Sequence, residues 1–182
     1  MLENPILYVV TGGPGVGKTT ILRELAERGF CYVPEVARQI IQEQMSCGGN
    51  ALPWANQSAY AELMLDRSIL SFKQHTPSTK TTFCDRGIPD TLCYLKLIGK
   101  DTAKAASASL NYRYAQKVFL APAWEEIYTC DAERRQSWDE AVKTSELMLR
   151  VYRECGYEVI ELPRATPVER AEFILQHVKS AS

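Results

Sequence analysis

Residues 12–19 read Gly12-Gly13-Pro14-Gly15-Val16-Gly17-Lys18-Thr19 and match the phosphate-loop (Walker A) pattern GxxxxGK[ST] at every fixed position. The apolar, β-rich run Ile6–Thr11 precedes this loop, and a segment with apolar residues at helical spacing follows it. A strand before the loop and a helix after it are the context in which the pattern binds phosphate. The sequence therefore predicts a site for the phosphates of ATP or a related nucleoside triphosphate.

The residue types in the loop explain this chemistry. Glycines let the backbone turn its N–H groups toward an anion, and the start of the following helix adds further N–H groups and a positive dipole end. We expect Lys18 to bind the β- and γ-phosphates and the Thr19 hydroxyl to bind Mg²⁺. Thr20 joins Gly12–Thr19 in the predicted nucleotide-binding set.

Five short apolar runs alternate with segments of helical spacing along the chain. The predicted strands are Ile6–Thr11, Phe30–Val33, Thr81–Cys84, Lys117–Leu120 and Tyr157–Leu162. The predicted helices are Thr19–Arg28, Glu35–Ser46, Asn56–Phe72, Thr91–Ile98, Asp101–Tyr112, Asp139–Cys155 and Pro167–Lys179, the last with Thr166 as its N-cap. This alternation is typical of a three-layer α/β fold, with a parallel sheet covered by helices on both faces.

Length and charge narrow the class of protein. A chain of 182 residues suits a single domain, here residues 1–182, and its net charge of −1 argues against a non-specific nucleic-acid binder. We expect a cytoplasmic protein, because the start does not resemble a secretory signal and no apolar run reaches the length of a membrane span. The six cysteines form no CxxC pair, so we expect reduced thiols rather than a zinc site.

Two acidic residues follow predicted strands and are the candidates for catalysis. Ligands bind at the carboxyl ends of the strands in such sheets. Asp85, after the third strand, could hold Mg²⁺ or activate an attacking hydroxyl, and Arg86 could bind a phosphate or the substrate. Alternatively, Asp85 is an ordinary helix N-cap beside a solvated Arg86. Glu35, after the second strand, is the rival general base or a plain first-turn glutamate, and Arg38 would point the same way one turn later.

An arginine-rich segment lies between the fourth strand and the next helix. Residues 131–138 read DAERRQSW, and Arg134 and Arg135 could stabilise charge on a transferred phosphoryl group if residues 129–138 form a lid. The alternative is a solvated charged turn. Trp54 could stack on a base at an acceptor pocket, although packing is the simpler role for it and for Tyr60, Trp124 and Trp138.

The motifs together resemble the small P-loop kinases that act on nucleosides and nucleotides. The resemblance is greater still to bacterial AAA-type ATP-binding proteins, a group that includes the ribosylnicotinamide kinase domain. It rests on the phosphate loop and on Val33–Ile41, Pro53-Trp54, Phe83–Asp90, Phe119–Tyr128 and Glu133–Trp138. It implies an ATP-binding fold with the strand order 2-3-1-4-5. Gly87 departs from the deoxynucleoside kinase pattern, which has Ser at this place.

These observations predict a Mg²⁺-dependent enzyme that transfers phosphate from ATP to a small, nucleoside-like acceptor. Lys18, Arg86, Arg134 and Arg135 would stabilise charge, Thr19 and Asp85 would hold the metal, and Glu35 or Asp85 would activate the acceptor. The alternative is a nucleoside triphosphatase that acts as a regulatory switch and has no small-molecule acceptor. The acceptor itself and the formation of a homodimer stay open.

Overall fold

A five-stranded parallel sheet forms the centre of the molecule. The computed structural model describes residues 1–128 and 137–179. Its main sheet has the order β3-β4-β2-β6-β7, and every neighbouring pair is parallel. The strands are β3 (Cys31–Val33), β4 (Thr82–Asp85), β2 (Leu7–Thr11), β6 (Lys117–Leu120) and β7 (Glu158–Glu161). Since β2 is the first predicted strand and β3 the second, the predicted order 2-3-1-4-5 is confirmed.

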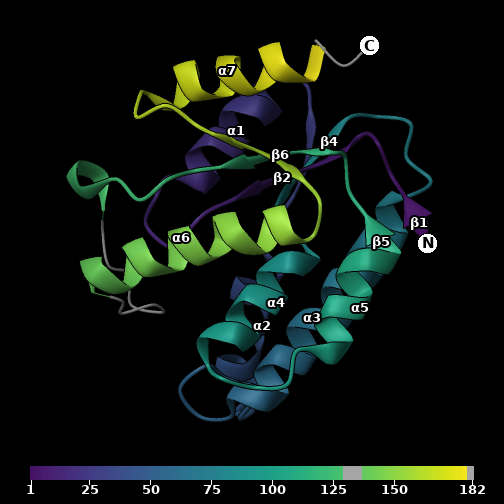
Figure 1. Ribbon diagram of the computed structural model, residues 1–182, viewed down its shortest axis with the longest axis vertical. Helices are drawn as coiled ribbons and strands as arrows, with labels where there is room; N and C mark the ends of the chain where they lie inside the picture. Colours follow the sequence, from purple (N-terminus) through teal and green to yellow (C-terminus); the bar gives the residue numbers. More distant parts are fainter. Residues whose placement is uncertain (129–136, 180–182) are drawn as a thin grey trace.

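Helices cover both faces of this sheet (Figure 1). One face carries α1 (Lys18–Glu27) and α7 (Pro167–Lys179), which pack against each other. The other face carries α6 (Trp138–Glu154) and α4 (Ile88–Leu97), with α2 (Val36–Cys47), α3 (Gln57–His75) and α5 (Ala103–Asn111) beside them; a short 3-10 helix, η1 (Glu125–Ile127), follows β6. The predicted three-layer α/β fold is therefore confirmed.

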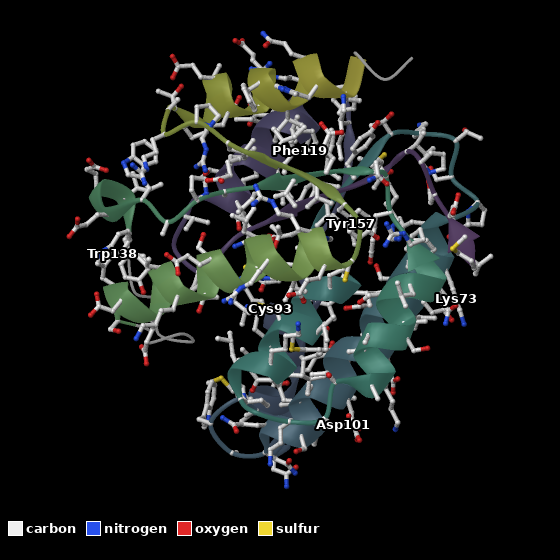
Figure 2. All side chains as sticks on the ribbon, in the orientation of Figure 1. Lys73, Cys93, Asp101, Phe119, Trp138 and Tyr157 are labelled. Atoms are coloured by element: carbon white, nitrogen blue, oxygen red, sulfur yellow. The ribbon has the colours of Figure 1, made fainter. Side chains whose placement is uncertain are left out.

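The alternating side chains of β2 divide the core into two parts. Tyr8 and Val10 are buried with the apolar faces of α1 and α7, and Tyr8 packs against Phe119 at a ring distance of 6.2 Å. Figure 2 shows Phe119 in this layer beneath α7. Leu7 and Val9 are buried in the opposite layer with residues of α4 and α6. Both faces of β2 are thus apolar, which explains why its sequence reads as a continuous hydrophobic run.

Two features differ from the predictions. The predicted helix over residues 91–98 begins earlier, at Ile88, so Asp90 belongs to its first turn. A second sheet pairs β1 (Leu2–Glu3) with β5 (Tyr112–Arg113), which the sequence did not predict because two-residue strands show no alternation. Within the described residues, no helix combines the length and the apolar character needed to cross a bilayer.

Candidate active site

The phosphate loop connects β2 to α1 in the geometry that the sequence predicts. Gly12, Gly15 and Gly17 have φ values of 142°, 72° and 82°, a region that favours glycine. A side chain at Gly12 would also collide with the carbonyl oxygen of Ala121, which follows β6. The loop therefore needs glycine for its backbone path and for its close approach to the next strand.

Lys18 lies folded against the loop that precedes it. Its Nζ donates hydrogen bonds to the carbonyl oxygens of Gly12, at 3.1 Å, and Gly13, at 2.8 Å. Thr20 donates from Oγ1 to the carbonyl oxygen of Gly17 at 2.6 Å, while Thr19 is exposed. The cation is thus held against the start of the loop, and Thr19 is accessible from outside the protein core.

An open cavity of about 870 Å³ begins at this loop, and we call it the phosphate-loop cavity. Its volume is within the usual range for small-molecule and cofactor sites, roughly 300–1,000 Å³. Its walls come from the loop and from segments at the carboxyl ends of three other strands, namely Pro14–Thr20, Glu35, Arg38, Trp124, Ile127, Arg164–Pro167, Glu169 and Arg170. Positive side chains outnumber negative ones on these walls (Lys18, Arg38, Arg164 and Arg170 against Glu35 and Glu169), which suits a polyanionic ligand.

A hydrogen-bonded ion pair links the two strand-end motifs. The Nε of Arg86 donates to Oε1 of Glu35 at 2.7 Å, and its Nη1 donates to Oδ1 of Asp90 at 3.0 Å. The Arg86 side chain is only 11% exposed and that of Glu35 10%. The structure therefore brings together Glu35 and Arg86, which the sequence placed at the ends of separate strands, and the alternative of a solvated Arg86 is wrong.

Neighbouring carboxylates keep Arg86 charged. Burial alone lowers the pKa of a guanidinium, but here Glu35, Asp90 and Asp85 outweigh burial and raise the pKa of Arg86 above its ordinary value. Arg86 is consequently a permanent cation at the edge of the sheet.

Asp85 ends β4 and is buried beside the central strand, where it pairs with Val10 of β2. It is not the cap of the following helix. Gly87 occupies the N-cap position of α4, and its N–H donates to Oδ2 of Asp90 at 2.8 Å. The alternative of Asp85 as an ordinary N-cap is therefore wrong, because the N-cap position lies two residues later and the helix starts at Ile88.

Asp90 is a residue of this site that sequence reasoning missed. Besides Arg86 and Gly87, it accepts hydrogen bonds from Oγ1 of Thr11 at 2.6 Å and from the hydroxyl of Tyr152 at 2.5 Å. Burial is the main cause that raises the pKa of Tyr152 well above its ordinary value, and the negative charge of Asp90 is the second. The phenol therefore stays protonated and serves as a hydrogen-bond donor to Asp90. The signal available in the sequence was the closeness of Asp90 to Arg86, one helical turn along the chain.

Sequence reasoning also missed Arg170, which lies on the wall of the phosphate-loop cavity. Arg170, on α7, is 2% exposed, and its Nη1 donates to the carbonyl oxygen of Val16 in the phosphate loop at 3.0 Å. Its guanidinium lies 6.0 Å from the ring of Trp124, which we had expected only to pack. Burial lowers the pKa of Arg170 to about 10. The sequence did offer one signal: the loop after the fifth strand lies at the carboxyl edge of the sheet, where ligands bind in such folds.

The other sequence-predicted residues lie elsewhere. Arg134 and Arg135 fall outside the described residues, as does most of the predicted lid over residues 129–138. Trp54 is 58% exposed and lines a separate surface hollow with Asn56 and Lys100, so it is not a core packing residue, and its stacking on a base stays a prediction. Tyr60 is buried and packs against Tyr94, with ring centroids 5.4 Å apart.

Comparison with known proteins agrees with this architecture. A family model described as an AAA domain matches residues 7–170. The chain belongs to this AAA domain family. No curated protein sequence matches the AAA-domain chain.

Solved structures of kinases share the fold of this AAA-domain chain. The NadR protein in complex with NR has a TM-score of 0.73 at 17% identity, over 95% of this chain and 51% of NadR, so the chain spans about half of that protein. Deoxyadenosine kinase from M. mycoides has a TM-score of 0.61 at 14% identity, over 97% and 100% of the two chains. Shikimate kinase from Acinetobacter baumannii has a TM-score of 0.57 at 17% identity, over 97% and 94%. The fold is that of small P-loop kinases.

Proposed function

We propose that the protein is a Mg²⁺-dependent phosphotransferase that moves the γ-phosphoryl group of ATP to a hydroxyl of a small, nucleoside-like acceptor. The observation that carries the proposal is the position of Glu35. Glu35 lines the same cavity as Lys18 and Thr19, and its carboxylate is paired with the buried cation Arg86. A phosphate site with a carboxylate and a fixed arginine beside it suits transfer of a phosphoryl group to a hydroxyl.

The phosphate loop supplies the nucleotide end of the reaction. Its glycines and the start of α1 would bind the phosphates through backbone N–H groups, and Lys18 would leave the carbonyls of Gly12 and Gly13 for phosphate oxygens. The excess of cations on the cavity walls supports a triphosphate as the ligand.

Between the two candidate bases, the geometry favours Glu35. Glu35 contributes to the wall of the phosphate-loop cavity, whereas Asp85 is not among the described residues that line it. Glu35 would accept the proton of the acceptor hydroxyl while Arg86 holds the carboxylate in place. Arg134 and Arg135 remain proposed sources of positive charge for the transferred group.

A Mg²⁺ ion fits the oxygen donors of this edge of the sheet. Thr19 is exposed on the cavity wall, and Asp85, which is not among the described residues of that wall, would reach the ion through its water ligands from the end of the neighbouring strand. Mg²⁺ commonly takes one or two such protein ligands together with water and phosphate oxygens. When bound, the ion would neutralise charge on the phosphates during transfer.

The molecules bound in the neighbouring structures support a small acceptor. Those structures hold NR, shikimate and the nucleotide products of deoxyadenosine kinase. At 14–17% identity, however, the residues that select an acceptor are not transferable from them to this chain.

The test is a transfer assay with ATP, Mg²⁺ and a panel of acceptors: nucleosides, deoxynucleosides, nicotinamide riboside, shikimate and sugars. We expect mass spectrometry to detect one phosphorylated product whose amount equals that of the ADP formed. Slow ADP release that no acceptor accelerates would reject the proposal and favour the triphosphatase switch instead. ATP-dependent capture of a protein partner, without a phosphorylated small molecule, would then be the expected sign of that switch.

A further inference from the structure

Asp90 has no role in the phosphoryl transfer as proposed, yet it is among the most fully bonded side chains at this edge of the sheet. It is 4% exposed and is absent from the described walls of the phosphate-loop cavity. Its Oδ1 accepts from Thr11 and Arg86, and its Oδ2 accepts from Gly87 and Tyr152. An ionised carboxylate offers about four acceptor positions, so these donors use its whole capacity.

The backbone of Arg86 requires such support. With φ of 74°, it is the one non-glycine residue with positive φ in the described part of the chain. This conformation is strained for a residue that has a side chain, and it persists where the surroundings fix it. Here the N–H of Arg86 donates to the carbonyl oxygen of Val10 at 3.0 Å, and the next N–H, of Gly87, donates to Asp90. Asp90 therefore bonds both the backbone beside Arg86 and the guanidinium.

The two bonds to the guanidinium determine where it points. Asp90 holds Nη1 at 3.0 Å, which leaves Nε directed at Glu35, 2.7 Å away. A planar guanidinium held at one nitrogen has little freedom to rotate at the others. The position of the carboxylate of Glu35, a residue of the cavity wall, thus depends on the buried carboxylate of Asp90, a residue absent from the described walls of the cavity.

We propose that Asp90 is a positioning residue that aims Arg86, and through Arg86 the carboxylate of Glu35, at the acceptor hydroxyl. The inference rests on the proposed function for its catalytic consequence, but its structural part stands independently. Thr11 and Tyr152 hold Asp90 in turn. Thr11 is the last residue of β2 before the phosphate loop, and Tyr152 lies on α6. The network thus connects the phosphate loop, the acidic residues and α6.

The first test needs no turnover. It follows the Nε–H resonance of Arg86 by nitrogen-15 NMR, assigned with Arg86→Lys. In the wild type, the bond to Glu35 should keep this resonance visible and slow to exchange with water. In Asp90→Asn it should shift or broaden, because an amide cannot replace the charged partner of Nη1. An unchanged resonance and exchange rate in a folded Asp90→Asn protein would overturn the proposal.

The second test separates kcat from KM. Misplacing a reacting group by about 1 Å can lower the rate roughly 100-fold. Asp90→Asn should therefore lower kcat by about 10- to 100-fold while KM for ATP changes by less than about 3-fold. A higher KM for ATP with an unchanged kcat would contradict a role in positioning Glu35.

Asp90 also caps α4, so a control must remove a helix cap without touching Arg86. Asn56 accepts a hydrogen bond from the N–H of Ala59 at the start of α3, at 3.1 Å, and is exposed. Asn56→Ala should leave the Arg86 resonance and kcat at wild-type values. If Asn56→Ala reproduces both changes, loss of a helix cap explains them and the proposal is wrong.

Milder variants keep the test decisive if Asp90→Asn does not fold. Thr11→Val and Tyr152→Phe each remove one donor to Asp90 with little change of shape. Both variants should shift the Arg86 resonance in the direction expected for Asp90→Asn, but by a smaller amount. If neither variant shifts it, the proposal fails. A wild-type protein that phosphorylates no acceptor would count against the proposed function alone, because the resonance still decides the structural role of Asp90.

Discussion

The guanidinium of Arg170 donates a hydrogen bond to the carbonyl oxygen of Val16 at 3.0 Å, so a residue of helix α7 is bonded to the backbone of the phosphate loop. The Nε and Nη2 atoms of Arg170 are buried and have no hydrogen-bond partner among residues 1–128 and 137–179. The loop therefore depends on a cation whose own hydrogen-bonding capacity is only partly used within the described structure.

Arg170→Met tests this support. The variant loses a hydrogen bond from a charged donor, worth about 1.5–3 kcal/mol, and ATP affinity should fall by roughly 10- to 100-fold as the loop loosens. The melting temperature should change little, because the buried and incompletely bonded guanidinium is removed as well. Isothermal titration calorimetry and thermal denaturation measure the two effects. A large fall in melting temperature with unchanged ATP affinity would mean that Arg170 serves the core instead.

Lys18→Met tests the phosphate loop directly. Lys18 is buried among loop carbonyls, so methionine fills its space but offers no charge to a phosphate. We expect kcat/KM for ATP to fall by at least about 100-fold, since a charged donor to the transferred group is lost. Lys96→Met is the matched control, because Lys96 pairs with Glu154 on the surface. Equal loss in both variants would refute the role of Lys18.

Glu35→Gln and Asp85→Asn distinguish the base from the metal ligand. A general base raises the reaction rate roughly 10²- to 10⁴-fold. Glu35→Gln should therefore lower kcat by that factor without changing the Mg²⁺ concentration that the enzyme requires. Asp85→Asn should instead raise the Mg²⁺ concentration needed for half-maximal rate. Steady-state kinetics across a Mg²⁺ series measures both. If Glu35→Gln changes the Mg²⁺ requirement and Asp85→Asn lowers kcat instead, Asp85 is the base and Glu35 the metal ligand.

The thiols give a test of the core that is independent of function. Burial raises the pKa of Cys93 to about 12 and also raises that of Cys155, whereas Cys31 and Cys47 are exposed. Since the thiolate is the reactive form, two thiols of a Cys130→Ser variant should react quickly with a thiol reagent at pH 8.

The remaining thiols, those of Cys84, Cys93 and Cys155, should react only after unfolding. Burial raises the folded pKa values of these three thiols, so each should gain reactivity only at a higher pH in the folded protein than in the unfolded chain. Rapid reaction of all thiols in the native protein would contradict the burial described here.

The sheet and the loops at its carboxyl edge could be predicted because their signals are local. Strand β2 is buried on both faces, so it reads as a continuous apolar run, and the fixed glycines and lysine of the phosphate loop follow it directly. Once the strands were ordered, Glu35 and Asp85 had to lie at the same edge.

The contacts of Asp90 could not be predicted in the same way. Its bonds to Thr11 and Tyr152 join residues 79 and 62 positions apart, and no periodicity or motif spacing encodes such a pair. Arg170 and Trp124 were missed for a related reason, since helix packing alone decides whether a side chain reaches the cavity or the core.

The middle position of β2 has a consequence during synthesis. This strand carries the phosphate loop, and its partners on the two sides, β4 and β6, come later in the sequence, at residues 82–85 and 117–120. Until the ribosome has released Leu120, one edge of β2 has no partner, and an open apolar strand edge invites aggregation. A nascent chain that ends before β6 therefore carries a complete phosphate loop on a strand that still has one unpaired edge.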